Sequence, residues 1–216
     1  MKKIIGTAGT ILVLLVPVGV DAQEAEVTAN AGWVSQYYYR GILQKTSSAS
    51  AGLDVGVGAL YLGTWAADVG DGSEVDLYGG FGVELDQLSL SAGGTAYLYT
   101  HEFDDTYIEA NLGAGYGPIS VDFAIGSYRT DPEDQSYWFL GLTAEGGGWY
   151  GTFGTFGDEF DGSYGEAGYG FSAADLDFSI SAILSDESLS GHHNAAGDAT
   201  EEVTLVFGVS KTFGLN

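Results

Sequence analysis

Residues 88–100 read LSLSAGGTAYLYT, and apolar and polar side chains alternate along this stretch with a period of two. One face carries Leu88, Leu90, Ala92, Ala96 and Leu98, and the other carries Ser89, Ser91, Thr95, Tyr97 and Tyr99. Because successive side chains of a β-strand point to opposite sides, the pattern predicts a strand with one apolar and one polar face.

The same alternation recurs about twelve times along the chain, and no linker interrupts it. The composition agrees, since the chain has 35 glycines, only 3 prolines and 13% aromatic residues, which is typical of β-structure. We therefore expect one all-β domain. Its predicted strands are residues 26–40, 49–57, 60–67, 74–85, 88–100, 106–116, 119–128, 136–145, 149–157, 163–171, 175–184 and 202–213.

Short and long connections alternate between these predicted strands. The short ones are Gly58-Ala59, Asp86-Gln87, Gly117-Pro118, 146–148 and 172–174, and the long ones are 41–48, 68–73, 101–105, 129–135, 158–162 and 185–201. In an up-and-down barrel every second connection lies at the same end, so all short turns share one rim and all long loops the other. This predicts a transmembrane antiparallel up-and-down β-barrel of about 12 strands, with short periplasmic turns and longer extracellular loops.

The first 22 residues have the layout of a secretory signal peptide. Lys2 and Lys3 form a positive start, residues 11–16 are apolar, and Ala22 ends a small-residue cleavage site. The apolar run is shorter than the ~20 residues that a membrane-spanning helix needs. We expect residues 1–22 to be the signal peptide and residues 23–216 to form a barrel in the outer membrane of a Gram-negative bacterium. Outer-membrane lipid and the barrel assembly machinery are the partners this location implies.

A soluble barrel would place the apolar face inside, and alternation alone does not distinguish it from a membrane barrel. Carboxylates recur on the polar face, whereas the apolar face is almost uncharged, with Lys211 as an exception. Aromatic residues lie toward strand ends on the apolar face, as in the girdles of membrane barrels. These residues are Tyr37, Tyr39, Tyr116, Trp138, Phe171 and Phe213.

The formal net charge of −24 limits which classes of ligand the protein can bind. Nucleic-acid binding is excluded, because it requires lysine and arginine to neutralise phosphates. The chain has no cysteine, so disulfide and thiolate chemistry are also excluded.

Two segments carry a resemblance to a known family. Residues 28–41 read TANAGWVSQYYYRG and residues 58–82 read GALYLGTWAADVGDGSEVDLYGGFG. Together they resemble the TorF family of bacterial outer-membrane porins, most strongly over residues 27–115. The resemblance implies a pore and names no substrate.

The polar faces of the predicted strands should line the lumen, and they are rich in acids and tyrosines. Carboxylates attract cations, and bulky tyrosines narrow a pore, so we expect a porin-like channel for small cationic or neutral solutes. The alternative is a non-conducting structural or surface-binding barrel, whose acids merely hydrate a closed lumen. The predicted pore-lining residues are Arg40, Asp54, Glu74, Asp76, Tyr78, Glu84, Tyr97, Tyr99, Glu109, Asp122, Glu145, Glu166 and Asp177.

Arg40 is one of only six basic residues, and it follows three consecutive tyrosines. The planar guanidinium binds carboxylates with two hydrogen bonds. We predict that Arg40 pairs with lumen carboxylates and fixes the constriction. A structural salt bridge in a wet cavity is an equal alternative.

The sequence gives little support for a metal site or for catalytic activity. Neither DVGDGSE (68–74) nor GDEFDG (157–162) fits the EF-hand pattern, so no metal or other cofactor is expected. The chain lacks a Gly-x-Ser-x-Gly elbow and an HExxH motif, and we do not expect an enzyme. The only candidates for chemistry at a barrel rim are His101, Glu102, Asp104 and His192.

Overall fold

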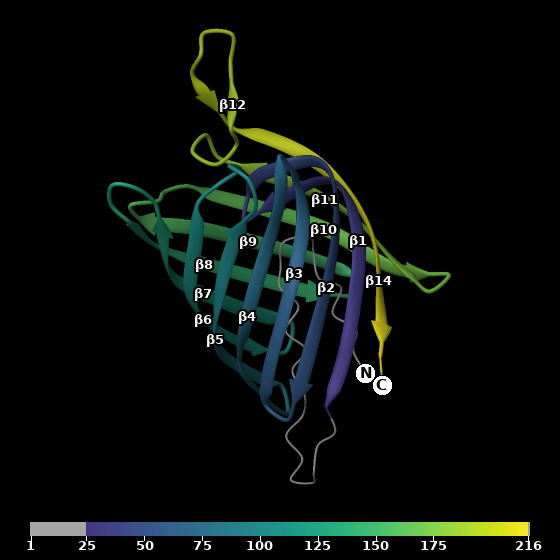
Figure 1. The fold of residues 1–216 in the computed structure, drawn as a ribbon. Helices are drawn as coiled ribbons and strands as arrows, with labels where there is room; N and C mark the ends of the chain where they lie inside the picture. Colours follow the sequence, from purple (N-terminus) through teal and green to yellow (C-terminus); the bar gives the residue numbers. More distant parts are fainter. Residues whose placement is uncertain (1–24, 216) are drawn as a thin grey trace.

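The computed structural model describes residues 25–215, which fold into a closed barrel of twelve antiparallel strands (Figure 1). The predicted signal peptide, residues 1–22, lies outside this range. No helix among the described residues is long and apolar enough to cross a membrane. The barrel strands are β1 Glu26–Tyr39, β2 Ile42–Val57, β3 Leu60–Gly70, β4 Gly72–Leu85, β5 Leu88–Tyr99, β6 Thr106–Tyr116, β7 Ile119–Arg129, β8 Gln135–Gly146, β9 Trp149–Asp158, β10 Ser163–Ala173, β11 Leu176–Ser185 and β14 Glu202–Gly214.

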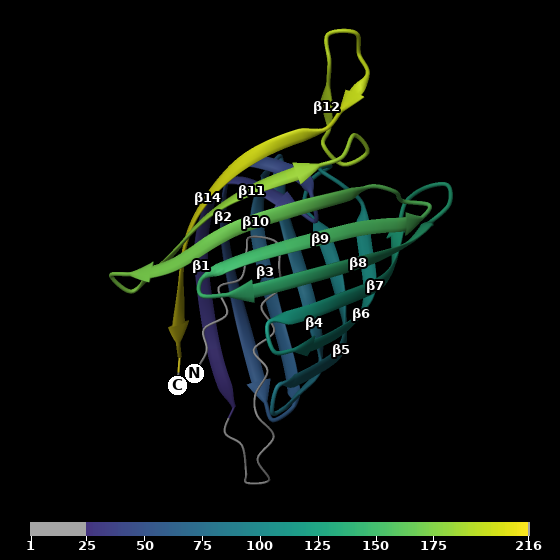
Figure 2. The ribbon, with the colours of Figure 1, turned by 180° about the vertical axis from the view of Figure 1, so that it is seen from behind.

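Each barrel strand pairs with its neighbours in the chain, and β1 pairs with β14 to close the ring. The closing register runs from Thr28 opposite Gly214 to Val34 opposite Gly208. Figure 2 shows the far wall, where β8 to β11 lie side by side. The predicted up-and-down antiparallel barrel of about 12 strands is therefore confirmed.

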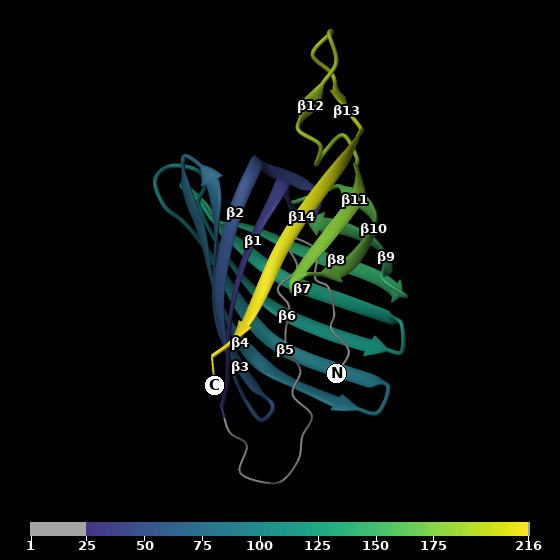
Figure 3. The same cartoon turned by 90° about the vertical axis from the view of Figure 1, so that its right-hand side faces the viewer.

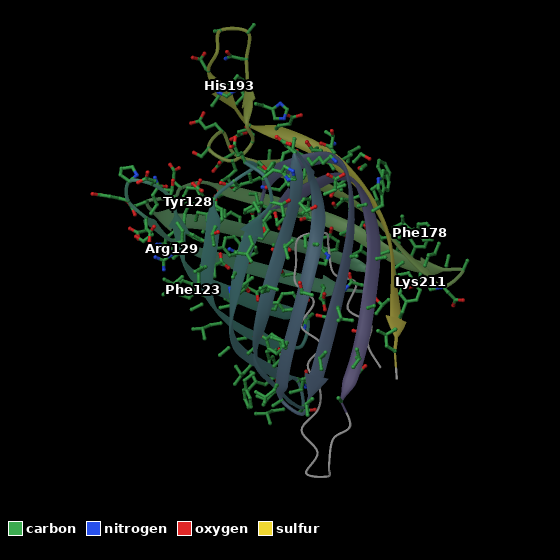
Figure 4. All side chains as sticks on the ribbon, in the orientation of Figure 1. Phe123, Tyr128, Arg129, Phe178, His193 and Lys211 are labelled. Carbon is green, nitrogen blue, oxygen red and sulfur yellow. The ribbon has the colours of Figure 1, made fainter. Side chains whose placement is uncertain are left out.

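The two ends of the barrel differ. One end, here called the turn end, has only two-residue connections: 58–59, 86–87, 117–118, 147–148 and 174–175. The opposite end, the loop end, carries residues 100–105, 130–134, 159–162 and 186–201. The last loop contains a small hairpin, β12 His192–His193 and β13 Ala199–Thr200, which rises above the barrel with His193 on it (Figures 3 and 4).

Two of the predicted long loops are wrong. Residues 42–48 belong to β2, so Arg40 and Gly41 alone connect it to β1, and Asp71 alone connects β3 to β4. Arg40 and Gly41 have φ values of 48° and 83°, as in the tight two-residue turns of β-hairpins. Residues 44–48 read QKTSS and are polar on both faces, so the alternation that marks the other strands is missing there.

The outer face of the barrel is apolar. Leu60, Leu62 and Val203 are between 62% and 66% exposed, and Figure 4 shows Phe123 and Phe178 on the outside of the wall. Lys211 also lies on this face, near the end of β14, with its Nζ 5.5 Å from the Phe213 ring centre. The apolar stem of such a lysine covers the wall while its ammonium reaches water.

The expectation that Tyr37 and Tyr39 belong to an outward aromatic girdle is wrong. The β1–β2 register shifts between Tyr37 and Tyr38, and a bulge of this kind disrupts the ladder locally and re-aims the side chains next to it. Tyr37 is 1% exposed, and Tyr39 reaches a tyrosine on β5. Trp33, before the shift, remains 42% exposed.

The inner surface has two different halves. Toward the turn end the inward positions are mostly small, as on β5 and β6, where they are Ser89, Ser91, Gly93, Gly113 and Gly115. Toward the loop end the buried inward side chains are mostly aromatic. These are Tyr37, Tyr38, Tyr78, Tyr97, Tyr137, Phe139, Phe156 and Tyr164.

Some inward aromatic rings lie directly over a glycine of the neighbouring strand. Tyr137 on β8 is opposite Gly126 on β7, and a methyl group added at Gly126 would come within 2.3 Å of the Tyr137 ring. Gly126 is therefore needed for the ring to lie flat against the wall.

We predict that Gly126→Ala lowers the free energy of unfolding by about 1–3 kcal/mol, because the buried Tyr137 ring must move. Urea unfolding of the barrel in detergent micelles measures the change. Gly165→Ala is the matched control, since an added methyl there meets nothing within 4 Å, and it should change the free energy by no more than about 0.5 kcal/mol. Equal effects of the two substitutions would contradict this packing account.

Candidate functional site

The tip of the β1–β2 hairpin, residues 37–43, folds into the barrel at the loop end (Figure 3). Two hydrogen bonds join this hairpin tip to β11 and β14, the strands that follow β1 around the ring. Ser185 on β11 donates from Oγ to the carbonyl oxygen of Gly41 over 2.5 Å, and Tyr38 donates to Oγ1 of Thr204 on β14 over 2.9 Å. Arg40 of the hairpin tip also bonds to Glu109 on β6, five strands from β1 in the ring, so the hairpin tip spans the lumen.

Apolar packing fills the space on both sides of the hairpin tip. On one side Tyr38, Ile42 and Leu43 join a buried cluster that contains Phe139, Phe156, Tyr164, Ile183, Leu189 and Val206. On the other side Tyr37 packs with Ala67 and Val69, and its ring centre lies 5.6 Å from that of Trp65. The hairpin tip is thus held as part of a core inside the barrel.

Arg40 at the hairpin tip forms an ion pair with Glu109 on β6. Nη1 and Nη2 of Arg40 lie 2.5 and 3.0 Å from the two carboxylate oxygens. The Glu109 side chain is completely buried and that of Arg40 is 15% exposed. The Arg40 guanidinium carbon also lies 4.1 Å from the ring centre of Phe139 on β8, at the distance of a cation–π contact.

The Glu109 carboxylate accepts further hydrogen bonds besides those from Arg40. It accepts hydrogen bonds from Tyr97 over 3.2 Å, from Tyr137 over 2.9 Å and from the Asn111 amide over 2.9 Å. Tyr39 in turn donates to the Tyr97 hydroxyl over 2.7 Å. A buried carboxylate is stable only when it is paired and hydrogen-bonded, and this one meets both conditions.

Glu74 and Asp76, here called the acidic pair, lie on β4 beside the hairpin tip. They are 1% and 3% exposed. Tyr37 donates to Oε1 of Glu74 over 2.6 Å. Oε2 of Glu74 and Oδ1 of Asp76 are buried, and neither has a hydrogen-bond partner among residues 25–215.

The other predicted pore-lining acids lie apart from this centre. Asp54 accepts from Tyr78 over 2.5 Å, and Glu166 accepts from Tyr150 over 2.5 Å. Tyr99, by contrast, lies opposite Glu74 in the β4–β5 register and packs against Phe103 and Tyr107. The remaining four lie on inward positions toward the turn end: Asp177, hydrogen-bonded to Ser172, and the exposed Glu84, Asp122 and Glu145.

Several residues of this centre were not predicted as pore-lining. Phe139, Asn111 and Trp65 occupy inward positions of β8, β6 and β3. Phe139 and Asn111 share the period-two face of Tyr137 and Glu109, but nothing in the alternation marks which inward residues a hairpin will contact. The three consecutive tyrosines before Arg40-Gly41 were the available signal, since such a run cannot alternate and the dipeptide favours a turn.

The rim residues considered for chemistry do not form one site. Asp104 accepts from Tyr107 and Tyr128, whereas His192 on the distant β12 pairs with Glu202. Within residues 25–215 there is no group of three or more histidine and acidic side chains that could hold a metal ion.

Comparison with known proteins supports the fold. A family model described as a bacterial protein of unknown function (Gcw_chp) matches residues 20–213, and no curated protein matches the chain. A chain from a study of the in-meso crystallization of membrane proteins is 9% identical with a TM-score of 0.59, over 88% of this chain and 84% of that one. The NanC porin in a rhombohedral crystal form is 10% identical with a TM-score of 0.50, over 88% and 100%. None of these matches names the TorF family.

We predict that Arg40→Ala lowers the free energy of unfolding by about 3–5 kcal/mol, because it leaves the buried Glu109 carboxylate without its cation. The double variant Arg40→Gln with Glu109→Gln should lose less, since both charges are then absent. Denaturant unfolding measures both values.

Arg129→Ala is the control for this prediction. Arg129 pairs with Asp134, but their side chains are 52% and 42% exposed, so its loss should cost at most about 1 kcal/mol. If Arg40→Ala cost no more than Arg129→Ala, the buried ion pair would not be holding the hairpin tip.

Proposed function

The chain belongs to a bacterial protein family of unknown function, and we propose that it is an outer-membrane channel through which small cationic or neutral solutes diffuse. The observation that carries the proposal is a closed barrel with an apolar outer wall and an acidic interior. A barrel of this kind satisfies every ladder hydrogen bond within itself and leaves no sheet edge, as a hydrocarbon environment requires.

The outer wall supports the location in the membrane. Large apolar or aromatic side chains are exposed on every barrel strand, including Leu53 and Val57 on β2 and Leu62 on β3. Soluble proteins rarely expose apolar patches above a few hundred Å². The long loops at one end and the two-residue turns at the other match the extracellular and periplasmic rims of outer-membrane barrels.

The interior supports a preference for cations. Among the inward acids, Glu109 is neutralised by Arg40. Glu84, Asp122 and Glu145 are exposed toward the turn end and make no ion pair with any other residue of the range 25–215. Such unpaired carboxylates attract cations and repel anions. The hairpin tip, crossing the lumen at the loop end, would be the constriction that limits solute size.

One structural similarity and one sequence resemblance support a channel function. One solved neighbour is itself a porin, and the motifs at residues 28–41 and 58–82 resemble the TorF family of outer-membrane porins. Both are consistent with a pore, and neither gives the solute.

A non-conducting structural barrel is the second candidate. The dense aromatic packing around the hairpin tip favours it, because Tyr37, Tyr38 and Phe139 are each at most 6% exposed. In this case the acidic interior would only hydrate the lumen.

Planar-bilayer recordings in a potassium chloride gradient test the proposal. We expect discrete conductance steps and a reversal potential close to the potassium equilibrium potential. The triple variant Glu84→Gln, Asp122→Asn, Glu145→Gln should move the reversal potential toward zero, because it removes three lumen charges.

A loop variant with the same change of charge is the control. Asp131, Glu133 and Glu187 are exposed at the loop end, so Asp131→Asn, Glu133→Gln, Glu187→Gln should leave the reversal potential nearly unchanged. A wild-type barrel without conductance would favour the structural candidate, and anion preference would refute the role given to the carboxylates.

A further inference from the structure

The acidic pair on β4 lacks a compensating charge. Glu74 and Asp76 are two residues apart on the same face of the strand, which places their Cα atoms about 7 Å apart. Both side chains are at least nine-tenths buried, and within the described part of the chain each has one carboxylate oxygen without a hydrogen-bond partner. A buried carboxylate that is neither paired nor fully hydrogen-bonded is strongly unfavourable.

No basic side chain of the described range neutralises the pair. Each of the four that this range contains is engaged elsewhere or faces outward. Arg40 pairs with Glu109, Lys45 with Asp68 and Arg129 with Asp134, while Lys211 lies on the outer face beside Phe213.

Aromatic side chains surround the acidic pair. In the strand register Asp76 lies between Trp65 on β3 and Tyr97 on β5, and Glu74 lies opposite Tyr99. Tyr37 of the hairpin tip covers the site and donates to one Glu74 oxygen. Two carboxylate oxygens without a partner in the described range, beside tyrosine and tryptophan side chains, form an environment suited to a positive charge.

We propose that Glu74 and Asp76 bind a monovalent cation beneath the hairpin tip, either an alkali ion or the primary ammonium group of a small organic solute. Binding would neutralise the charge left on the free oxygens. A place for this site on a conduction path rests on the proposed channel function, but the binding itself does not.

A monovalent cation fits these residues better than a divalent one. Calcium takes six to eight oxygen ligands, and no group of three or more acidic or histidine side chains suited to a metal occurs in the described part of the chain. The neighbouring carboxylate Glu109 is already bound to Nη1 and Nη2 of Arg40, so it is not free to add to the pair.

Thermal unfolding of the purified barrel in detergent micelles tests the proposal without requiring conductance. The probes are sodium, potassium and methylammonium chloride, each compared with N-methyl-D-glucamine chloride at equal ionic strength and at two pH values. We expect the unfolding midpoint of the wild type to rise by about 5–10 °C at a cation concentration 100-fold above the Kd. The comparison of alkali ions with methylammonium identifies which source of positive charge the site prefers.

Asp76→Asn and Glu74→Gln should each abolish the cation-dependent rise while the barrel still folds. Glu84→Gln is the matched control, because Glu84 lies on the same strand and inward face but is exposed toward the turn end, and it should keep the full rise.

A rise that is equal in all four proteins would overturn the proposal. So would a midpoint that depends on pH but not on the cation, since the pair would then hold a proton. If the rise occurs in a barrel that never conducts, the site stands and the channel function fails.

Discussion

The ion pair between Arg40 and Glu109 organises the interior of this barrel. It joins the first hairpin to β6 across the lumen, and Tyr97, Tyr137 and Asn111 complete the shell of the carboxylate. A charge pair removed from water gains stability only when its hydrogen bonds are satisfied. Here that requirement fixes where the hairpin tip lies.

The rest of the inner surface is consistent with this constraint. Glycines such as Gly126 let aromatic rings lie against the wall, and those rings pack around the hairpin tip. Toward the turn end, inward residues are small and the acids are exposed. The barrel therefore combines a polar, acidic half with an aromatic half that the hairpin tip crosses.

Much of the architecture could be predicted from the sequence. Period-two alternation gave the number of strands and their antiparallel order, because in a barrel wall every strand separates an apolar side from a polar one. The same rule failed at residues 42–48, where QKTSS (44–48) is polar on both faces, and at Tyr37 and Tyr39, which flank a register shift. A bulge changes facing without changing composition, so alternation cannot reveal it.

The centre of the lumen was predictable only in part. The scarcity of basic residues drew attention to Arg40 and to a carboxylate partner, but not to Glu109 in particular. That pairing depends on the inward fold of the hairpin, which brings together residues 69 positions apart. Likewise, the alternation placed Glu74 and Asp76 on the inward face but could not show that they are buried without a cation.

The central claim is that the hairpin tip, held by Arg40 and Glu109, is the constriction of the barrel. Single-channel conductance of Arg40→Ala beside the wild type in planar bilayers tests it most directly. The account predicts a larger conductance for Arg40→Ala, because the released hairpin tip no longer spans the lumen. Unchanged conductance and ion preference would contradict it, and Arg40 would then be only a structural brace for the first strand.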